Sequence, residues 1–107
     1  MRKSTKEDHK DLYGGLIRLH ILHHAAHEPL YGLWMIEELR HHGYKISPGT
    51  LYPMLHGLEA KGYLRSREQR DGKQVRRLYT ITASGRRAIN DARQKVRELF
   101  GELFESR

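Results

Sequence analysis

The chain has 107 residues, which is the size of a single domain. Its 20 Lys and Arg outnumber 13 Asp and Glu, and the resulting formal charge of +7 favours an anionic partner such as nucleic acid. It has no Cys, which excludes disulfides, Cys-based zinc sites and thiol catalysis. No apolar run approaches the roughly 20 residues of a membrane span. The charged N-terminus does not resemble a signal peptide, so we expect a cytoplasmic protein with no membrane partner.

Two helices are predicted in the first part of the chain. Residues 1–11 are expected to form a flexible arm that leads into a helix over residues 12–26. This helix is apolar on two sides, which is typical of a helix that packs against its own domain and against a partner chain. Residues 28–32 are expected to form a connector, and Gly43 ends a second helix over residues 33–42. The apolar sets of the first helix are Leu12, Leu16, Leu19, Leu22 and Ala26, and Tyr13, Ile17 and Ile21; the inward residues of the second are Leu33, Ile36 and Leu39.

The third helix is predicted to begin at Ser47 and to end near Gly62. Ser47 is expected to cap its first turn through the hydroxyl, and Pro48 suits the first helical position because no N–H donor is needed there. Pro53 is expected inside the helix, where its ring meets the carbonyl of the small residue Gly49; a short turn that ends at Pro53 is the alternative. The inward face consists of Leu51, Met54, Leu55 and Leu58, and the outward face of Gly49, Pro53, His56, Gly57 and Ala60.

A β-hairpin is predicted after the third helix, because the spacing of apolar residues there is no longer that of a helix and Asp71-Gly72 is a strong hairpin signal. If these two residues form the loop, Leu64 lies opposite Tyr79. Both side chains then share one face of the ribbon with Ile81, which agrees with the hydrophobic pattern.

The last helix is predicted over residues 83–105, with Thr82 as its cap. Its apolar residues follow steps of three and four, which is typical of a helix that pairs with a second copy. An ordinary amphipathic helix that lies on its own core is the alternative, but two terminal Phe residues would then be exposed at a cost. The predicted dimerisation residues are Ile89, Ala92, Val96, Leu99, Phe100, Leu103 and Phe104.

The order of elements is that of a mainly α winged helix-turn-helix protein (α-α-α-β-β-α) with a long C-terminal dimerisation helix. Residues 12–82 would form the DNA-binding domain and residues 83–107 the dimerisation helix. In such folds the second helix of the turn enters the major groove, and the hairpin flanks it. Residues 65–77 hold six basic and two acidic residues, and this net charge of +4 suits a wing along a phosphate backbone. The predicted DNA contacts are Ser47, Gly49, Thr50, Tyr52, Pro53 and His56 in the helix and Arg70, Lys73, Arg76 and Arg77 in the wing.

Three short runs resemble one known family. Pro-Gly-Thr-Leu-Tyr-Pro-Met-Leu-His-Gly-Leu-Glu at 48–59, followed by Gly-Tyr-Leu at 62–64, resembles the recognition helix of PadR-like transcriptional regulators. Arg-Leu-Tyr-Thr-Ile-Thr at 77–82 resembles their second wing strand, and Glu-Pro-Leu-Tyr-Gly at 28–32 resembles the entry into their second helix. The resemblance implies a homodimer, formed through the first and last helices, that binds a palindromic operator, usually as a repressor. It also implies a small-molecule effector at the dimer interface and DNA contacts by Thr50, Tyr52 and Pro53.

The first helix carries four histidines at three- and four-residue steps: His20, His23, His24 and His27. Histidines at i and i+4 can share a divalent metal, and His41 and His42 end the next helix, so a metal- or pH-responsive regulator is one hypothesis. The sequence favours the simpler interpretation that these are polar positions on a partly exposed helix. Glu28 is the one carboxylate that could complete the cluster, and no supporting partners for metal ligands are identifiable.

Functions of other classes are less well supported. A winged-helix module that binds another protein would not need the charge of the wing. An RNA-binding protein would expose aromatic residues for stacking, whereas Tyr63 and Tyr79 are expected in the core. We do not expect an enzyme or a bound cofactor, because the polar residues follow surfaces and do not converge, and no glycine-rich phosphate loop follows a strand.

Overall fold

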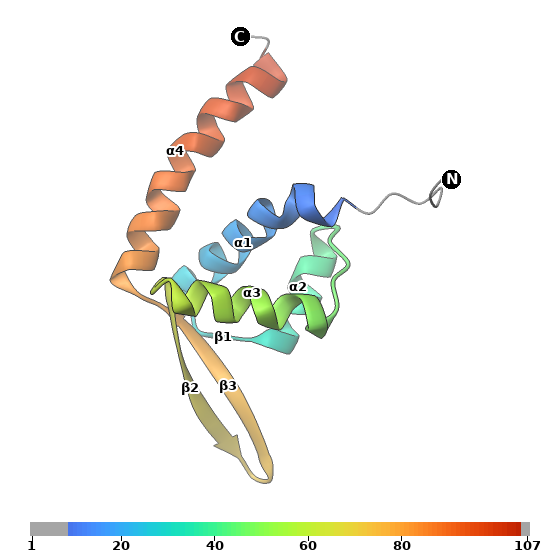
Figure 1. The fold of residues 1–107 in the computed structure, drawn as a ribbon, viewed down its shortest axis with the longest axis vertical. Helices are drawn as coiled ribbons and strands as arrows, with labels where there is room; N and C mark the ends of the chain where they lie inside the picture. Colours follow the sequence, from blue (N-terminus) through green and yellow to red (C-terminus); the bar gives the residue numbers. More distant parts are fainter. Residues whose placement is uncertain (1–8, 106–107) are drawn as a thin grey trace, which may run out of the picture.

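The computed structural model describes residues 9–105 and contains four helices and a small antiparallel sheet, as a mainly α winged helix requires (Figure 1). Most of the predicted flexible arm, residues 1–8, lies outside the described residues, and the first helix already begins at Lys10. None of the described helices has both the length and the apolar character needed to cross a membrane. The elements are α1 (Lys10–His27), β1 (Leu30–Tyr31), α2 (Gly32–His41), α3 (Pro48–Ala60), β2 (Leu64–Asp71), β3 (Gln74–Ile81) and α4 (Ala83–Glu105).

Helix α1 is apolar on two sides, and only one side is buried within the chain. Ile17 and Ile21 lie in the core as expected, whereas Leu12 and Leu16 are 72% and 45% exposed. Leu22 was expected on the same side as Leu12 and Leu16, but it is buried in the core. The helix therefore presents a narrower apolar strip to solvent than the sequence predicted.

The segment between α1 and α2 is a strand, which corrects the prediction of a plain connector. Strand β1 pairs with β3, with Leu30 opposite Tyr79 and Tyr31 opposite Leu78. Two residues are too few to show a period of two, so no sequence pattern revealed the strand. The prediction that Leu33 points inward was also wrong, because its side chain is 69% exposed and Met35 occupies the core.

The face of the hairpin that is buried agrees with the prediction, but the pairing of the two strands does not. Its turn consists of Gly72 and Lys73, so Leu64 lies opposite Ile81 and not opposite Tyr79. Gly72 has a φ of 65°, and the shifted turn places it at the first central position, where both common two-residue hairpin turns require positive φ. The shift is by two residues, so Leu64 and Tyr79 still share the buried face.

Helix α4 leaves the body of the domain and extends away from it (Figure 1). Its first turn is capped as predicted, because the Gly85 N–H donates to the Thr82 hydroxyl at 3.0 Å. Gly85 is buried, and a Cβ there would overlap the carbonyl oxygen of Tyr63 and the side chain of Ile81. Close backbone packing therefore fixes the base of α4 on the hairpin.

Candidate nucleic-acid interface

Helix α3 begins at Ser47, but the hydroxyl of this residue does not cap it. The side chain makes no cap hydrogen bond, which contradicts the sequence prediction. The Ser47 carbonyl instead accepts hydrogen bonds from the N–H groups of Thr50 and Leu51, at 3.0 and 2.9 Å. The Thr50 N–H, one of the two donors that a capping hydroxyl could satisfy, therefore already has a partner. Gly49 is exposed, and its N–H has no acceptor within the helix.

The phase of α3 matches the prediction. Leu51, Met54, Leu55 and Leu58 are buried, and Gly49, Pro53, His56, Gly57 and Ala60 are exposed. Pro53 lies inside the helix, so the alternative of a short turn is excluded. The exposed face is built of compact residues, with the His56 ring as its one large polar group, and such a face can approach another surface closely.

The Tyr52 side chain occupies the border between the exposed and buried faces of α3. It is half-buried, and its hydroxyl and ring edge lie against Gly32, the first residue of α2. Tyr52 also lines a cavity of about 710 Å³ together with Tyr31, Trp34 and Arg76. The Tyr52 hydroxyl lies against the start of α2; its predicted contact with DNA stays a prediction.

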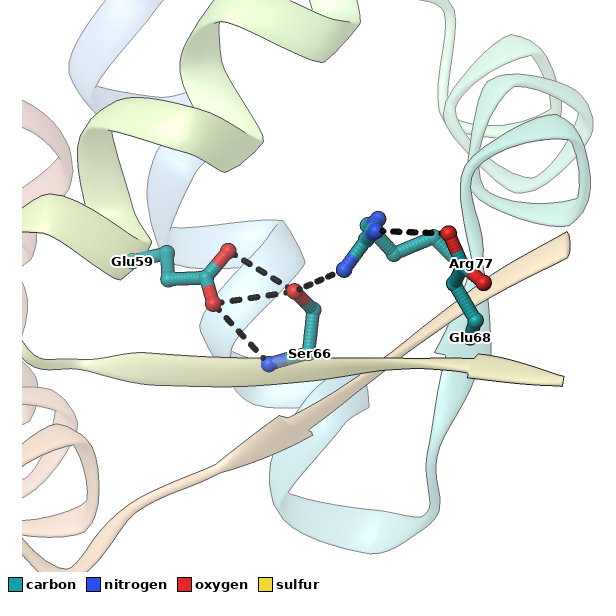
Figure 2. A network of polar contacts seen from close by, with 4 residues as sticks. All are labelled: Glu59, Ser66, Glu68 and Arg77. Carbon is teal, nitrogen blue, oxygen red and sulfur yellow. Dashed lines mark hydrogen bonds and ion pairs between the residues drawn. The ribbon is translucent and has the colours of Figure 1, made fainter.

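A polar network joins the end of α3 to both strands of the wing (Figure 2). The Glu59 carboxylate accepts a hydrogen bond from the Ser66 N–H at 3.1 Å, and the Ser66 hydroxyl lies 2.9 Å from both carboxylate oxygens. The Arg77 guanidinium donates to the Ser66 hydroxyl at 3.1 Å and pairs with Glu68 at 3.4 Å. Glu59, Ser66 and Arg77 thus couple the position of the wing to that of the helix. Sequence reasoning missed Glu59 and Ser66, although Glu59 ends the family-like motif.

Arg76 is held on the opposite face of the wing. Its guanidinium lies 4.9 Å from the centre of the Tyr31 ring and 3.2 Å from the Asp71 carboxylate. The Tyr31 hydroxyl in turn donates to Gln69 at 3.0 Å, so the short strand β1 braces the wing. Within the described part of the chain, the exposed Arg65, Arg67, Arg70 and Lys73 form no ion pair.

The predicted dimerisation residues divide into two groups. Ile89 and Ala92 are half-buried and, with Val96, line a groove against Leu16 and Leu19 of α1. The remaining residues stand on the protruding half of α4, where Leu103 and Phe104 are 64% and 70% exposed. The exposed members of the predicted seam are Val96, Leu99, Phe100, Leu103 and Phe104.

The structure separates the four predicted histidines of α1. His20 and His24 lie close to His42 at the end of α2. His23 and His27 do not join this set of ring nitrogens, although the His23 ring stands edge-on to the His24 ring at 5.2 Å, and His27 Nδ1 is 2.9 Å from the His23 carbonyl oxygen.

Three comparisons identify relatives of this chain. A model of the transcriptional regulator PadR-like family matches residues 21–91. The chain is 48% identical over 88 residues to the transcriptional regulator Rv3488 of Mycobacterium tuberculosis, and the alignment covers 82% of each protein. The crystal structure of a PadR family transcriptional regulator from Eggerthella lenta superposes with a TM-score of 0.78 at 30% identity, covering 91% of this chain and 88% of that one.

The fold also resembles that of Bacillus subtilis PadR in complex with operator DNA, with a TM-score of 0.65 at 21% identity. That likeness covers 71% of this chain and 44% of the other, and it concerns the fold alone. The family model and the M. tuberculosis relative both span the helix-turn-helix and the wing. The chain therefore belongs to the PadR-like family of transcriptional regulators.

Proposed function

We propose that the protein binds double-stranded operator DNA as a homodimer and acts as a transcriptional repressor. The observation that supports this most directly is the Glu59–Ser66–Arg77 network, which holds a strongly basic wing beside a compact, exposed helix face. That combination suits a helix in the major groove and a ribbon along the adjacent phosphates. The structural neighbour from B. subtilis, described in complex with operator DNA, adds support by analogy of fold.

In this proposal α3 reads the groove and the wing neutralises phosphates. Gly49, Thr50, Pro53 and His56 belong to the part of α3 that would face base edges, and Ser47 lies at its start, where helix N–H groups favour phosphate. Arg70 and Lys73 at the tip of the wing would bind phosphates without first losing an ion pair. Arg76 and Arg77 would also bind phosphates, and contacts with Tyr31 and Ser66 hold their guanidinium groups in position.

The homodimer is supported by apolar surface that one chain leaves uncovered. Leu12 and Leu16 of α1 and Leu103 and Phe104 of α4 are exposed and would gain from burial against a second copy. A two-fold dimer would place two α3 helices about 34–36 Å apart and would match a palindromic operator.

A small-molecule effector at the dimer interface would occupy the groove between α1 and α4. Its walls are Leu16, Leu19, Ile89 and Val96, and its volume of about 280 Å³ is close to the lower limit of about 300 Å³ for ligand pockets. The groove is open on one side, so a second chain would be needed to enclose a ligand there.

The test is fluorescence anisotropy with labelled DNA from upstream of the protein's own gene, between 50 and 200 mM salt. A dimer that neutralises about 6–10 phosphates should lose about 10³–10⁵-fold in affinity over that range. Unlabelled DNA of scrambled sequence is the control for specificity. A flat salt response, or equal affinity for scrambled DNA, would contradict operator binding and would favour a module that binds another protein.

A further inference from the structure

Two pairs of polar residues, each spaced by four, meet where α1 lies against α2. His20 and His24 stand one turn apart on α1, and Glu38 and His42 stand one turn apart at the end of α2. Residues four apart share one helix face, so each helix presents both members of its pair to the other. The packing of the two helices therefore brings three imidazoles and one carboxylate together.

The distances within this group are short enough for a shared ion. One ring nitrogen each of His20, His24 and His42 lies within 4.8 Å of the others. The Glu38 Oε2 atom lies 3.1 Å from His42 Nε2 and 3.5 Å from His24 Nε2. In a tetrahedral site with bonds of about 2.0–2.1 Å, ligand atoms stand about 3.4 Å apart, so small side-chain rotations would close the group around an ion.

Two of the three imidazoles, those of His20 and His24, are partly buried. Burial lowers the pKa of His20, and the neighbouring His42 lowers it further. Burial also lowers the pKa of His24, although Glu38 opposes this shift. Trp34 stands edge-on to the His24 ring at 5.6 Å, and Tyr44 stands edge-on to the His20 ring at 5.4 Å, so aromatic side chains flank the group.

We propose that His20, His24, His42 and Glu38 bind one divalent transition-metal ion per chain. Imidazole nitrogen with a single carboxylate suits Zn²⁺ or Ni²⁺ and does not suit Mg²⁺ or Ca²⁺, which prefer oxygen ligands. Glu38 supplies the negative charge, and its Oε2 atom lies within 3.5 Å of ring nitrogens of two of the three histidines.

The proposed site differs from the set that the sequence suggested. His42, which the sequence analysis named as a possible neighbour, and Glu38 take the place of His23 and His27, and no pattern along α1 could indicate Glu38. The His23 and His27 rings lie with their centres 4.7 Å apart, but His27 Nδ1 is engaged with the His23 carbonyl. The proposed ion would join α1, which bears the uncovered apolar strip, to α2, which leads into the recognition helix.

The experiment is isothermal titration of ZnSO₄ and NiSO₄ into the full chain, prepared without a histidine tag and with EDTA removed. The expected result is one ion per chain, with affinity at least about tenfold weaker for each of His24→Gln, His42→Gln and Glu38→Gln, because each variant removes one of the four proposed ligands. His41→Gln is the matched control, since it removes the adjacent, exposed histidine and should bind as the unmodified chain does. Absence of binding, or equal affinity for His42→Gln and His41→Gln, would overturn the proposal.

A second measurement covers the case in which a ligand variant fails to fold. Co²⁺ added to the unmodified chain should develop the intense visible bands of tetrahedral coordination, and Zn²⁺ should displace it. A spectrum of hydrated, octahedral Co²⁺ would overturn the proposal. Both experiments are made without DNA, so their outcome is independent of whether the chain binds an operator.

Discussion

The Tyr52 hydroxyl lies against Gly32 so closely that a single methyl group on Gly32 would overlap the phenol. This contact joins α3 to the first residue of α2. It is the reason that the turn from β1 into α2 needs a glycine, and it holds α3 against the start of α2.

We therefore expect Gly32→Ala to destabilise the protein by about 1–3 kcal/mol, the usual cost of overpacking a well-packed contact. Urea unfolding followed by circular dichroism measures this change. Gly15→Ala is the matched control, because a Cβ at Gly15 meets no atom within 4 Å and Ala favours the helix. In the double variant Gly32→Ala/Tyr52→Ala part of the loss should be recovered. Equal effects of Gly32→Ala and Gly15→Ala would contradict the contact.

The Glu59–Ser66 contact predicts a coupled effect on stability and on DNA binding. Glu59→Gln removes the charge that holds the Ser66 N–H and hydroxyl, so we expect a loss of about 1–2 kcal/mol in the free energy of unfolding. We also expect weaker DNA binding, since the wing and Arg77 lose their anchor on α3. Glu102→Gln, an exposed change on α4, should alter neither quantity. DNA affinity unchanged in Glu59→Gln would show that the network does not position the wing.

The tip of the wing predicts a specific change in salt dependence. Arg70→Ala/Lys73→Ala should weaken DNA binding on all sequences alike and reduce the slope of log affinity against log salt by about 4, because the dimer carries two wings and each phosphate that is no longer neutralised lowers the slope by about 1. Anisotropy titrations at several salt concentrations measure the slope. Lys95→Ala/Arg97→Ala on α4 removes the same charge elsewhere and should leave the slope unchanged. If both pairs lowered it equally, the effect would be one of net charge and not of the wing.

The uncovered apolar end of α4 predicts the oligomeric state. Leu103→Glu/Phe104→Glu should convert the dimer to a monomer, because both side chains are more than three-fifths exposed in one chain and are proposed to be buried in the dimer. Sedimentation velocity at several concentrations distinguishes the two states. Glu105→Gln, a mild change at the next residue, should leave the dimer intact. A monomeric unmodified chain, or a double variant that remains dimeric, would count against this interface.

Removal of the hydroxyl is expected to affect stability at Thr82, before α4, but not at Ser47, before α3. Thr82→Ala removes the acceptor of the Gly85 N–H and should cost about 0.5–2 kcal/mol. Ser47→Ala should have little effect on stability, because the Ser47 hydroxyl makes no cap hydrogen bond. Thermal unfolding of the two variants side by side is sufficient, and a larger loss for Ser47→Ala would reverse our assignment of the caps.

Local patterns were sufficient to predict the helices, the wing and the family resemblance. Burial of Leu51, Leu55 and Leu58 follows from their spacing, because a period near 3.6 places them on one side of a helix wherever that helix lies. Thr82 was predicted as a cap since the signal lies within one turn of its target. The predicted register of the hairpin was wrong because moving the turn by one residue shifts the strand pairing by two, which preserves the faces, and the hydrophobic pattern cannot distinguish the two registers.

The order of amino acids alone is therefore enough to establish the identity of each long element and the phase of α3, since these depend on interactions between near neighbours, whereas it misplaced Leu22 of α1 and Leu33 of α2. Which elements meet is established only by the folded chain, which brings together Tyr52 with Gly32, Glu59 with Ser66, and His20 and His24 with His42. Contacts of this kind join residues of different elements, and they exist only after the core has fixed the distance and angle between those elements. No periodicity along one helix contains that information, because the period of a helix describes its own faces and not the neighbour against which each face comes to lie.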